Sequence, residues 1–196
     1  MSTLSAHSFE EGACPERFLS TNWPMQSFGV VIPTKYPDII APLLVSLKLY
    51  EPNPPRIIII ADGHDDGYGY EVIKYDFPDF VFSRSVNLGI NALGRNDVIL
   101  CNDDIVLLEP ETFQRLCNTA YSYPKIGLIS PLIKGCAGNE FQRWHEYEDR
   151  WKGAGNIVAI YGAAPVCFPL VYIKRELFDR VGLMNEDITQ YGFDDD

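Results

Sequence analysis

Basic residues are scarce in this chain of 196 residues. It has 16 Lys and Arg against 27 Asp and Glu, which gives a formal net charge of −11. Phosphate backbones repel a surface of that sign, so we expect no nucleic-acid partner. A bound divalent cation would offset part of the negative charge locally. Hydrophobic residues make up 46% of the chain, which argues against disorder and allows one domain with a sizeable core.

The chain also lacks closely spaced cysteines. Five cysteines are present, and none forms a C-x-x-C motif: Cys14, Cys101, Cys117, Cys136 and Cys167. These spacings do not suit a structural zinc site. Three of the five lie in apolar segments, which favours reduced core thiols and a cytoplasmic location.

No signal peptide and no membrane-spanning segment is expected. Residues 1–27 are mixed and polar, and we interpret them as a leader or wrapping segment. The longest apolar run, 157–173, is interrupted by Gly162, Pro165 and Pro169, and it is shorter than the about 20 residues of a transmembrane helix. We expect two strands joined by a turn there. Any attachment to a membrane would then be peripheral.

Apolar runs alternate with amphipathic segments over the rest of the chain. Strands are expected at 28–33, 56–61, 79–83, 97–102 and 126–131. Helices are expected at 37–50, 87–95, 110–123 and 174–182. Pro42 lies inside the first of these helices, so that helix starts late or kinks. The alternation predicts an α/β sandwich with a mostly parallel central sheet flanked by helices.

Acidic side chains follow two of the predicted strands. Asp62 ends the second strand, and Asn102, Asp103 and Asp104 follow the fourth. Ligands of such a sheet gather at the carboxyl ends of its strands. Carboxylate oxygens there suit Mg²⁺ or Mn²⁺, which bind substrate phosphates as well. The alternative is a turn in which Asn and Asp side chains hydrogen-bond the local backbone, and the spacing alone favours neither interpretation.

Five segments occur in an order and an approximate spacing that match a known enzyme family. They are FGVVIPTKYPDIIAPLLVSL, IIIIADG, NLGINALGR, VILCNDDIVL and YGFDDD. Together they resemble glycosyltransferase family 2, the inverting enzymes of GT-A fold. The resemblance spans about residues 28–196 and implies a GT-A-type catalytic domain. Because the chain ends at FDDD, we interpret it as a truncation or the N-terminal domain of a longer protein.

The resemblance implies roles for residues at the predicted sheet edge. Pro33 and Thr34 would begin the loop around the nucleotide, and Asp62 would read the base, usually uracil. Asn87 and Gly89 would flank the ribose and the sugar.

The D-x-D position of the family is occupied here by Asn102, Asp103 and Asp104. The resemblance implies that Asp104 binds Mn²⁺ or Mg²⁺, while Asn102, in place of the first aspartate, and Asp103 lie at the nucleotide sugar.

The FDDD segment resembles the acidic motif late in the catalytic domain. By that resemblance Asp195 is the candidate general base, with Asp194 beside it. Three neighbouring carboxyl groups should raise the proton affinity of one of them. Read without the resemblance, the segment is a solvated acidic terminus.

Residues 134–156 contain the candidate acceptor site. Trp144, Tyr147 and Trp151 share one face of a helical pattern, and aromatic faces can stack on sugar rings. Such stripes more often pack against their own domain, and that interpretation is the stronger one here.

These roles predict an inverting, metal-dependent glycosyltransferase. It would move a hexosyl or deoxyhexosyl group from a nucleotide-diphosphate sugar, UDP-sugar being favoured, to a hydroxyl group of a glycan or another acceptor. One alternative is a nucleotidyltransferase, although that class typically has a Gly-rich, basic loop where this chain has PTKYPD. Another is a nucleotide-sugar-binding module without turnover. The segment 63–70 lacks the P-loop and dinucleotide-binding patterns, which argues against an ATPase or a Rossmann dehydrogenase.

Overall fold

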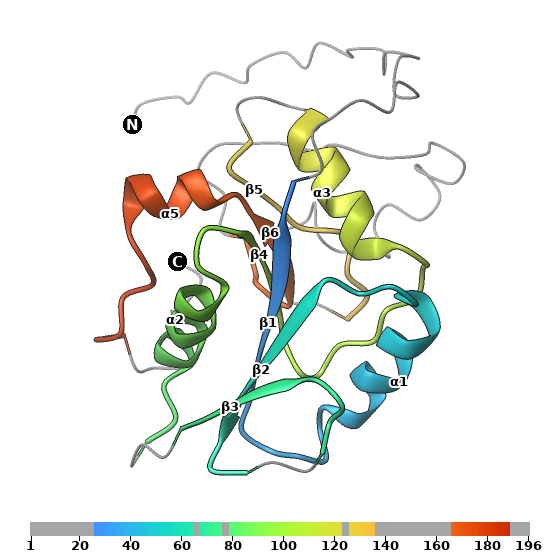
Figure 1. Ribbon diagram of the computed structural model, residues 1–196, viewed down its shortest axis with the longest axis vertical. Helices are drawn as coiled ribbons and strands as arrows, with labels where there is room; N and C mark the ends of the chain where they lie inside the picture. Colours follow the sequence, from blue (N-terminus) through green and yellow to red (C-terminus); the bar gives the residue numbers. More distant parts are fainter. Residues whose placement is uncertain (1–25, 65–66, 76–78, 123–125, 136–165, 189–196) are drawn as a thin grey trace, which may run out of the picture.

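The computed structural model describes residues 26–64, 67–75, 79–122, 126–135 and 166–188. Within these ranges a six-stranded sheet lies between two layers of helices (Figure 1), and its strand order is β3-β2-β1-β4-β6-β5. The strands are β1 (Phe28–Thr34), β2 (Arg56–Asp62), β3 (Glu71–Tyr75), β4 (Asp97–Cys101), β5 (Leu128–Ile129) and β6 (Leu170–Ile173). Neighbours are parallel from β3 to β4, and β6 is antiparallel to both β4 and β5. The predicted α/β fold with a mostly parallel sheet is confirmed.

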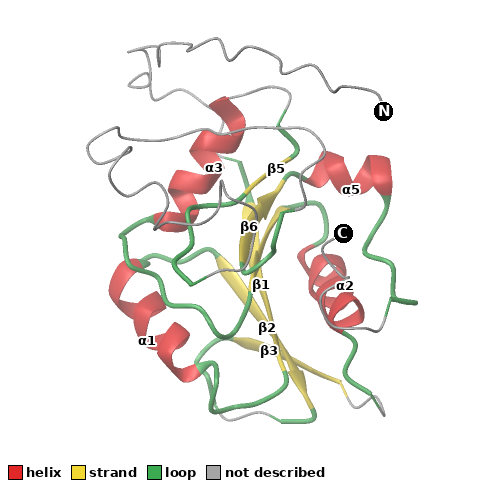
Figure 2. Cartoon of the chain, turned by 180° about the vertical axis from the view of Figure 1, so that it is seen from behind, coloured by secondary structure: helices red, strands yellow, loops and turns green. Residues whose placement is uncertain are grey.

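Helices cover both faces of the sheet. In Figure 2, α1 (Ala41–Tyr50) and α3 (Thr112–Ser122) lie on one side, and α2 (Phe82–Leu93) and α5 (Arg175–Val181) lie on the other. The division follows the two-residue alternation of the strands. In β1, Val30 and Ile32 belong to the apolar cluster on the α1 side, whereas Val31 belongs to the cluster on the α2 side.

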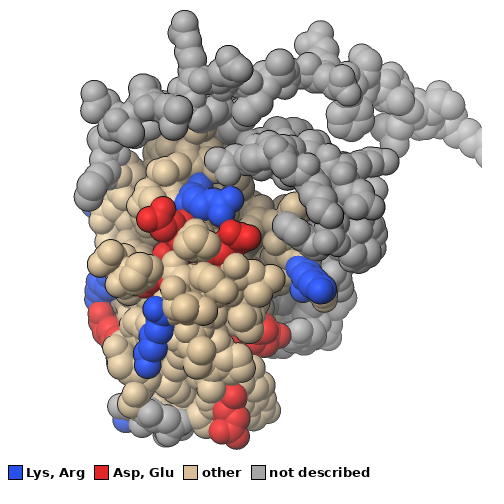
Figure 3. Space-filling view, turned by 90° about the vertical axis from the view of Figure 1, so that its right-hand side faces the viewer, with Lys and Arg blue, Asp and Glu red and all other residues tan. Residues whose placement is uncertain are grey.

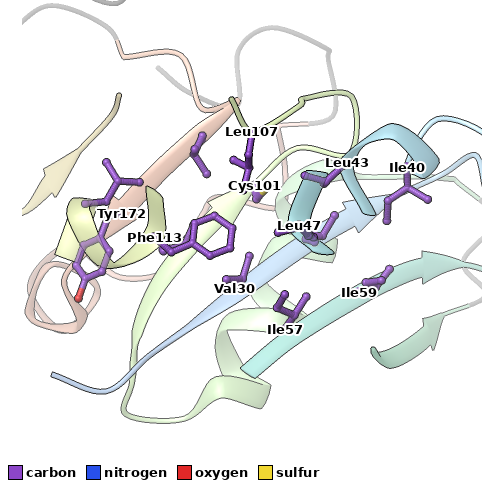
Figure 4. Packing of buried hydrophobic residues seen from close by; sticks show 14 of the residues in the cluster. Val30, Ile40, Leu43, Leu47, Ile57, Ile59, Cys101, Leu107, Phe113 and Tyr172 are labelled. Atoms are coloured by element: carbon purple, nitrogen blue, oxygen red, sulfur yellow. The ribbon is translucent and has the colours of Figure 1, made fainter. Parts of the chain in front are cut away.

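The core on the α1 side consists of interlocking aliphatic and aromatic side chains (Figure 4). Its members come from the sheet and from both helices, and they include Val30, Ile57, Ile59, Leu43, Leu47 and Phe113. All of these are at most 4% exposed. The apolar run IIIIA of β2 is buried on both faces because each face meets its own helical layer.

The longer predicted elements are confirmed within a few residues. β1, β2 and β4 occupy the predicted positions, and α5 is followed by Gly182 at φ +88°. The first helix starts late, at Ala41, with Pro42 in its first turn, where a missing backbone N–H costs nothing. The helix predicted at 110–123 begins at Thr112, because Glu111 has a positive φ of 55° and interrupts the helical conformation.

The strand predicted at 79–83 is wrong. Val81 directly precedes α2, which then runs to Leu93, so the helix predicted at 87–95 begins earlier and ends sooner than expected. The third strand is β3, whose residues are mostly half-buried or exposed because it forms an edge of the sheet. A short apolar run such as DFVFS does not by itself distinguish a strand from the first turn of a helix.

Two further strand predictions are met only in part. The strand predicted at 126–131 is reduced to the two residues of β5. Of the two strands predicted within 157–173, the second is found as β6, and the first lies outside the described residues. The leader predicted at 1–27 also lies almost wholly outside them.

Gly89 lets α2 approach the sheet closely. A β-carbon at this position would lie 2.3 Å from Cγ1 and 2.7 Å from Cγ2 of Val31 in β1. Any larger residue would therefore force the helix away from the strand.

The described surface and helices bear on possible partners. In Figure 3, which looks onto the side that carries α1 and α3, the Lys and Arg residues are scattered among acidic ones and form no broad patch on the described part of that face. Every helix within the described ranges is too short or too polar to cross a bilayer. The absence of a nucleic-acid partner stays a prediction.

Candidate functional site

Three neighbouring strands bring the predicted site residues to one edge of the sheet. The order β2-β1-β4 places Thr34, Asp62 and Asn102 at or just after the carboxyl ends of adjacent parallel strands. This edge is the lower one in Figure 1. Asp103 and Asp104 follow Asn102 in the turn after β4. The sheet therefore gathers residues that are up to 70 positions apart in the chain, as its topology predicts.

Thr34 lies beside the turn of Asn102, Asp103 and Asp104, which we call the acidic turn. By the two-residue alternation of β1, Thr34 belongs to the same face of the sheet as Val30 and Ile32, the face that α1 covers. Thr34 is only 1% exposed. The hydroxyl donates to the carbonyl oxygen of Tyr36, at 3.4 Å from Oγ1. It also lies close enough to the Asp103 carboxylate to lower the pKa of that group.

Asp103 lies partly buried beside a second carboxylate. Burial is the main cause that raises the pKa of Asp103, and the negative charge of Asp104 raises it further. The Thr34 hydroxyl opposes this shift, as do the backbone N–H of Asp103 itself and the nearby His64. The net effect is a raised pKa of Asp103. Keeping both carboxylates ionised therefore costs free energy, which a bound cation would offset.

Asn102 contributes an unpaired oxygen to the same turn. Its backbone N–H donates to the carbonyl oxygen of Pro169 at 2.8 Å, which fixes the turn against the start of β6. Its side-chain Oδ1 is buried and has no hydrogen-bond partner among the described residues. A buried polar oxygen of this kind calls for a ligand or an ordered water.

Asp62 ends β2 opposite Tyr75 of β3, and it is half-buried. The next residue, Gly63, donates its backbone N–H to the carbonyl oxygen of Tyr75 at 2.8 Å. His64 then turns back toward β1, with Nε2 at 3.2 Å from the carbonyl oxygen of Lys35 and Nδ1 at 2.8 Å from the Tyr68 hydroxyl.

His64 and Tyr68 are the residues that the sequence analysis missed. The only available signal was their place in the loop after Asp62, because the contact to Lys35 joins two loops that are distant in the chain.

The other two residues assigned to the donor site lie within α2. Asn87 has its amide engaged inside the protein: Nδ2 donates to the Met184 carbonyl oxygen and to Glu186 Oε1, both at 2.9 Å, and Oδ1 accepts from Met184 N at 3.1 Å. Gly89 packs against Val31. These contacts give both residues a structural task, and their contact with the ribose and the sugar stays a prediction.

The acidic turn has the chemistry of a magnesium or manganese site. Among the described residues, no three His, Cys, Asp or Glu side chains gather as a complete protein cage for a metal ion. Mg²⁺ usually needs only one or two carboxylates, because substrate phosphates and waters complete its shell. The adjacent Asp103 and Asp104 and the orphaned Oδ1 of Asn102 therefore fit such an ion.

The described cysteines fit the prediction of reduced thiols. Cys101 and Cys117 are buried free thiols, and Cys167 is half-buried. Burial raises the pKa of Cys101, which keeps its thiol neutral next to the acidic turn.

The remaining predicted site residues lie outside the described part of the chain. They are the proposed base Asp195 with its neighbour Asp194, and the acceptor candidates Trp144, Tyr147 and Trp151.

Solved structures with the same fold are glycosyltransferases. No family model and no curated protein sequence matches the chain. A mannosyltransferase from Pyrobaculum calidifontis, in complex with GDP-Man and Mn²⁺, aligns over 91% of this chain with 16% identity and a TM-score of 0.57. Glucosyl-3-phosphoglycerate synthase from Mycobacterium tuberculosis, in complex with UDP, aligns over 81% with 14% identity and a TM-score of 0.52. TarS from S. aureus aligns over 85% with 13% identity and a TM-score of 0.57.

These similarities establish the fold as the GT-A type. The chain spans 54% of the length of the mannosyltransferase, 67% of the synthase and 32% of TarS.

Proposed function

We propose that this chain is the nucleotide-sugar-binding part of a divalent-metal-dependent glycosyltransferase. The observation that carries the proposal is the paired carboxylate turn of Asp103 and Asp104 at the sheet edge that also holds Thr34 and Asp62. The fold supports it, because two structural neighbours were solved with a nucleotide or a nucleotide sugar, one of them together with Mn²⁺.

Each residue at the edge has a distinct task in this proposal. Asp104, the exposed carboxylate, would hold Mn²⁺ or Mg²⁺, with Asn102 and Asp103 beside it at the nucleotide sugar. When bound, the ion would act as a Lewis acid toward the diphosphate leaving group. Pro33 and Thr34 would begin the loop around the nucleotide.

The donor is proposed to be a UDP-sugar, with Asp62 accepting a hydrogen bond from the base. The structural neighbours include both a GDP-mannose and a UDP complex, so the choice of base needs direct measurement. The transferred group would be a hexosyl or deoxyhexosyl residue, and the acceptor a hydroxyl group of a glycan or another molecule.

The transfer is proposed to invert the anomeric centre. The acceptor hydroxyl would attack from the face opposite the leaving diphosphate and lose its proton to a carboxylate. Asp195 is the proposed base, and Asp194 would raise its proton affinity by like-charge repulsion.

Replacing Asp195 with asparagine is expected to lower kcat by about 10²–10⁴-fold, the usual contribution of a general base. The affinity for the donor nucleotide should stay close to that of the wild type, because the substitution leaves the edge of β1, β2 and β4 intact. The measurement combines calorimetry against UDP- and GDP-sugars in Mn²⁺ with detection of the released nucleotide diphosphate and the glycosylated product.

The same experiment separates the alternatives. Binding without any transfer by the wild type would favour a binding module, and release of pyrophosphate would favour a nucleotidyltransferase. A wild-type chain that binds no nucleotide sugar in the presence of Mn²⁺ would refute the proposal.

A further inference from the structure

The loop after Asp62 is built from residues that resist ordering. Three glycines between β2 and β3 have left-handed backbone conformations, with φ of +67° at Gly63, +68° at Gly67 and +79° at Gly69. Glycine loses more conformational entropy on ordering than any other residue. A loop that must present Asp62 to a ligand therefore needs an anchor beyond its own backbone.

His64 provides such an anchor through both ring nitrogens. Because a carbonyl oxygen can only accept, Nε2 donates its hydrogen to the Lys35 carbonyl oxygen at 3.2 Å. In the neutral ring Nδ1 then accepts from the Tyr68 hydroxyl at 2.8 Å, and the two rings meet edge to face with their centroids 6.1 Å apart. Tyr68 is itself fixed, since it is 7% exposed and belongs to the core on the α1 side.

The anchor reaches the residues around the acidic turn. Lys35 directly follows Thr34, whose hydroxyl lies close enough to the Asp103 carboxylate to lower its pKa. His64 also lies near Asp103, because it is among the groups that influence the pKa of that carboxyl. The loops after β1 and β2 are thus joined by side-chain hydrogen bonds that begin at a core tyrosine, and both loops lie beside Asp103 in the turn after β4.

We propose that His64 is a positioning residue, which together with Tyr68 fastens the loop after Asp62 to the loop after Thr34. The inference rests on the proposed function, because its purpose is to preorganise the nucleotide end of the donor site. His64 contacts no reacting atom in this arrangement. Its effect is to remove an ordering cost that would otherwise be subtracted from the binding energy of the nucleotide.

His64→Ala is expected to raise the KM for the nucleotide sugar about tenfold, the equivalent of one or two lost hydrogen bonds, with kcat changed by less than about twofold. His64→Gln should recover part of the affinity, because its amide N–H can still donate to the Lys35 carbonyl oxygen. Tyr68→Phe should weaken binding in the same way. The double variant should be no worse than His64→Ala alone, since both substitutions break one chain of bonds.

Tyr70→Phe is the matched control. It removes a hydroxyl from the same loop, one for which no hydrogen-bond partner is found among the described residues, and should leave both constants unchanged. Equal KM values for the wild type and His64→Ala would overturn the proposal, as would additive effects of the two substitutions.

A second measurement tests the positioning role without any nucleotide. Hydrogen exchange of peptides that cover residues 60–75 should be faster in His64→Ala than in the wild type, and unchanged in Tyr70→Phe. Unchanged exchange in His64→Ala would refute the anchor itself. Faster exchange together with a wild type that binds no nucleotide sugar would instead refute the proposed function and leave the anchor standing.

Discussion

Asp104→Asn is expected to abolish most of the contribution of Mn²⁺ to nucleotide binding. The substitution keeps the size of the side chain and removes the one exposed carboxylate of the acidic turn. Changing even a residue that only supports a metal ligand typically costs about 10–100-fold in metal affinity, so the loss of a direct ligand should cost at least that much. The measurement is calorimetric titration of UDP in the presence and absence of Mn²⁺.

The control must remove the same charge nearby without touching the turn. Glu109→Gln does so, because Glu109 lies five residues later in an exposed position, where its carboxylate forms a long ion pair with Arg115, at 3.9 Å. Its Mn²⁺-dependent affinity should match the wild type. In a chelator, wild type and Asp104→Asn should bind equally weakly. Unaltered Mn²⁺ dependence in Asp104→Asn would remove the metal site from this turn.

Asp97→Ala is expected to cause the largest loss of stability, at the opposite edge of the sheet. Asp97 begins β4, is 2% exposed, and accepts three hydrogen bonds: from the Tyr121 and Tyr172 hydroxyls at 2.6 and 2.7 Å, and from Arg175 N at 2.7 Å. Its carboxylate thereby joins α3, β6 and the start of α5. Alanine would leave buried donors without an acceptor, and we expect the free energy of unfolding to fall by about 3–5 kcal/mol.

Two comparison variants make the stability prediction specific. Asp97→Asn keeps an oxygen for Arg175 N and offers an N–H₂ group to the tyrosine hydroxyls, which can rotate to accept, so it should lose clearly less. Asp179→Ala breaks only an exposed pair with Arg175 at 3.3 Å, and should change stability by about 0–1 kcal/mol. Urea denaturation measures all three. Equal losses for Asp97→Ala and Asp179→Ala would contradict the account.

The central strands could be predicted because both of their faces are buried. Short, nearly continuous apolar runs are typical of strands that are buried on both faces. Three such runs, FGVVIP, RIIIIA and DVILC, form β1, β2 and β4. The edge strand β3 has no such run: EVIKY alternates charged with apolar residues, and only Tyr75 is fully buried. The more apolar DFVFS instead predicts a strand, although its apolar residues lie at the start of α2.

The candidate site was predictable only where it follows directly from strand ends. Asp62 and the turn of Asp103 and Asp104 lie at the edge where the topology requires them. The anchor formed by His64 could not be predicted, since it depends on a contact between side chain and backbone of two separate loops. The inward-facing amide of Asn87 depends in the same way on residues almost 100 positions later.

The reversed direction of β6 determines where the chain leaves and re-enters the sheet. β5 runs toward the carboxyl edge and β6 starts from it, so the chain between Ile129 and Leu170 leaves and re-enters the sheet on the side of the acidic turn. The re-entry point is fastened by the bond from Asn102 N to the Pro169 carbonyl oxygen. In the proposed function, the acceptor candidates Trp144 and Trp151 lie within this stretch of sequence and the donor residues lie outside it, so changes between these two points would separate acceptor choice from donor binding.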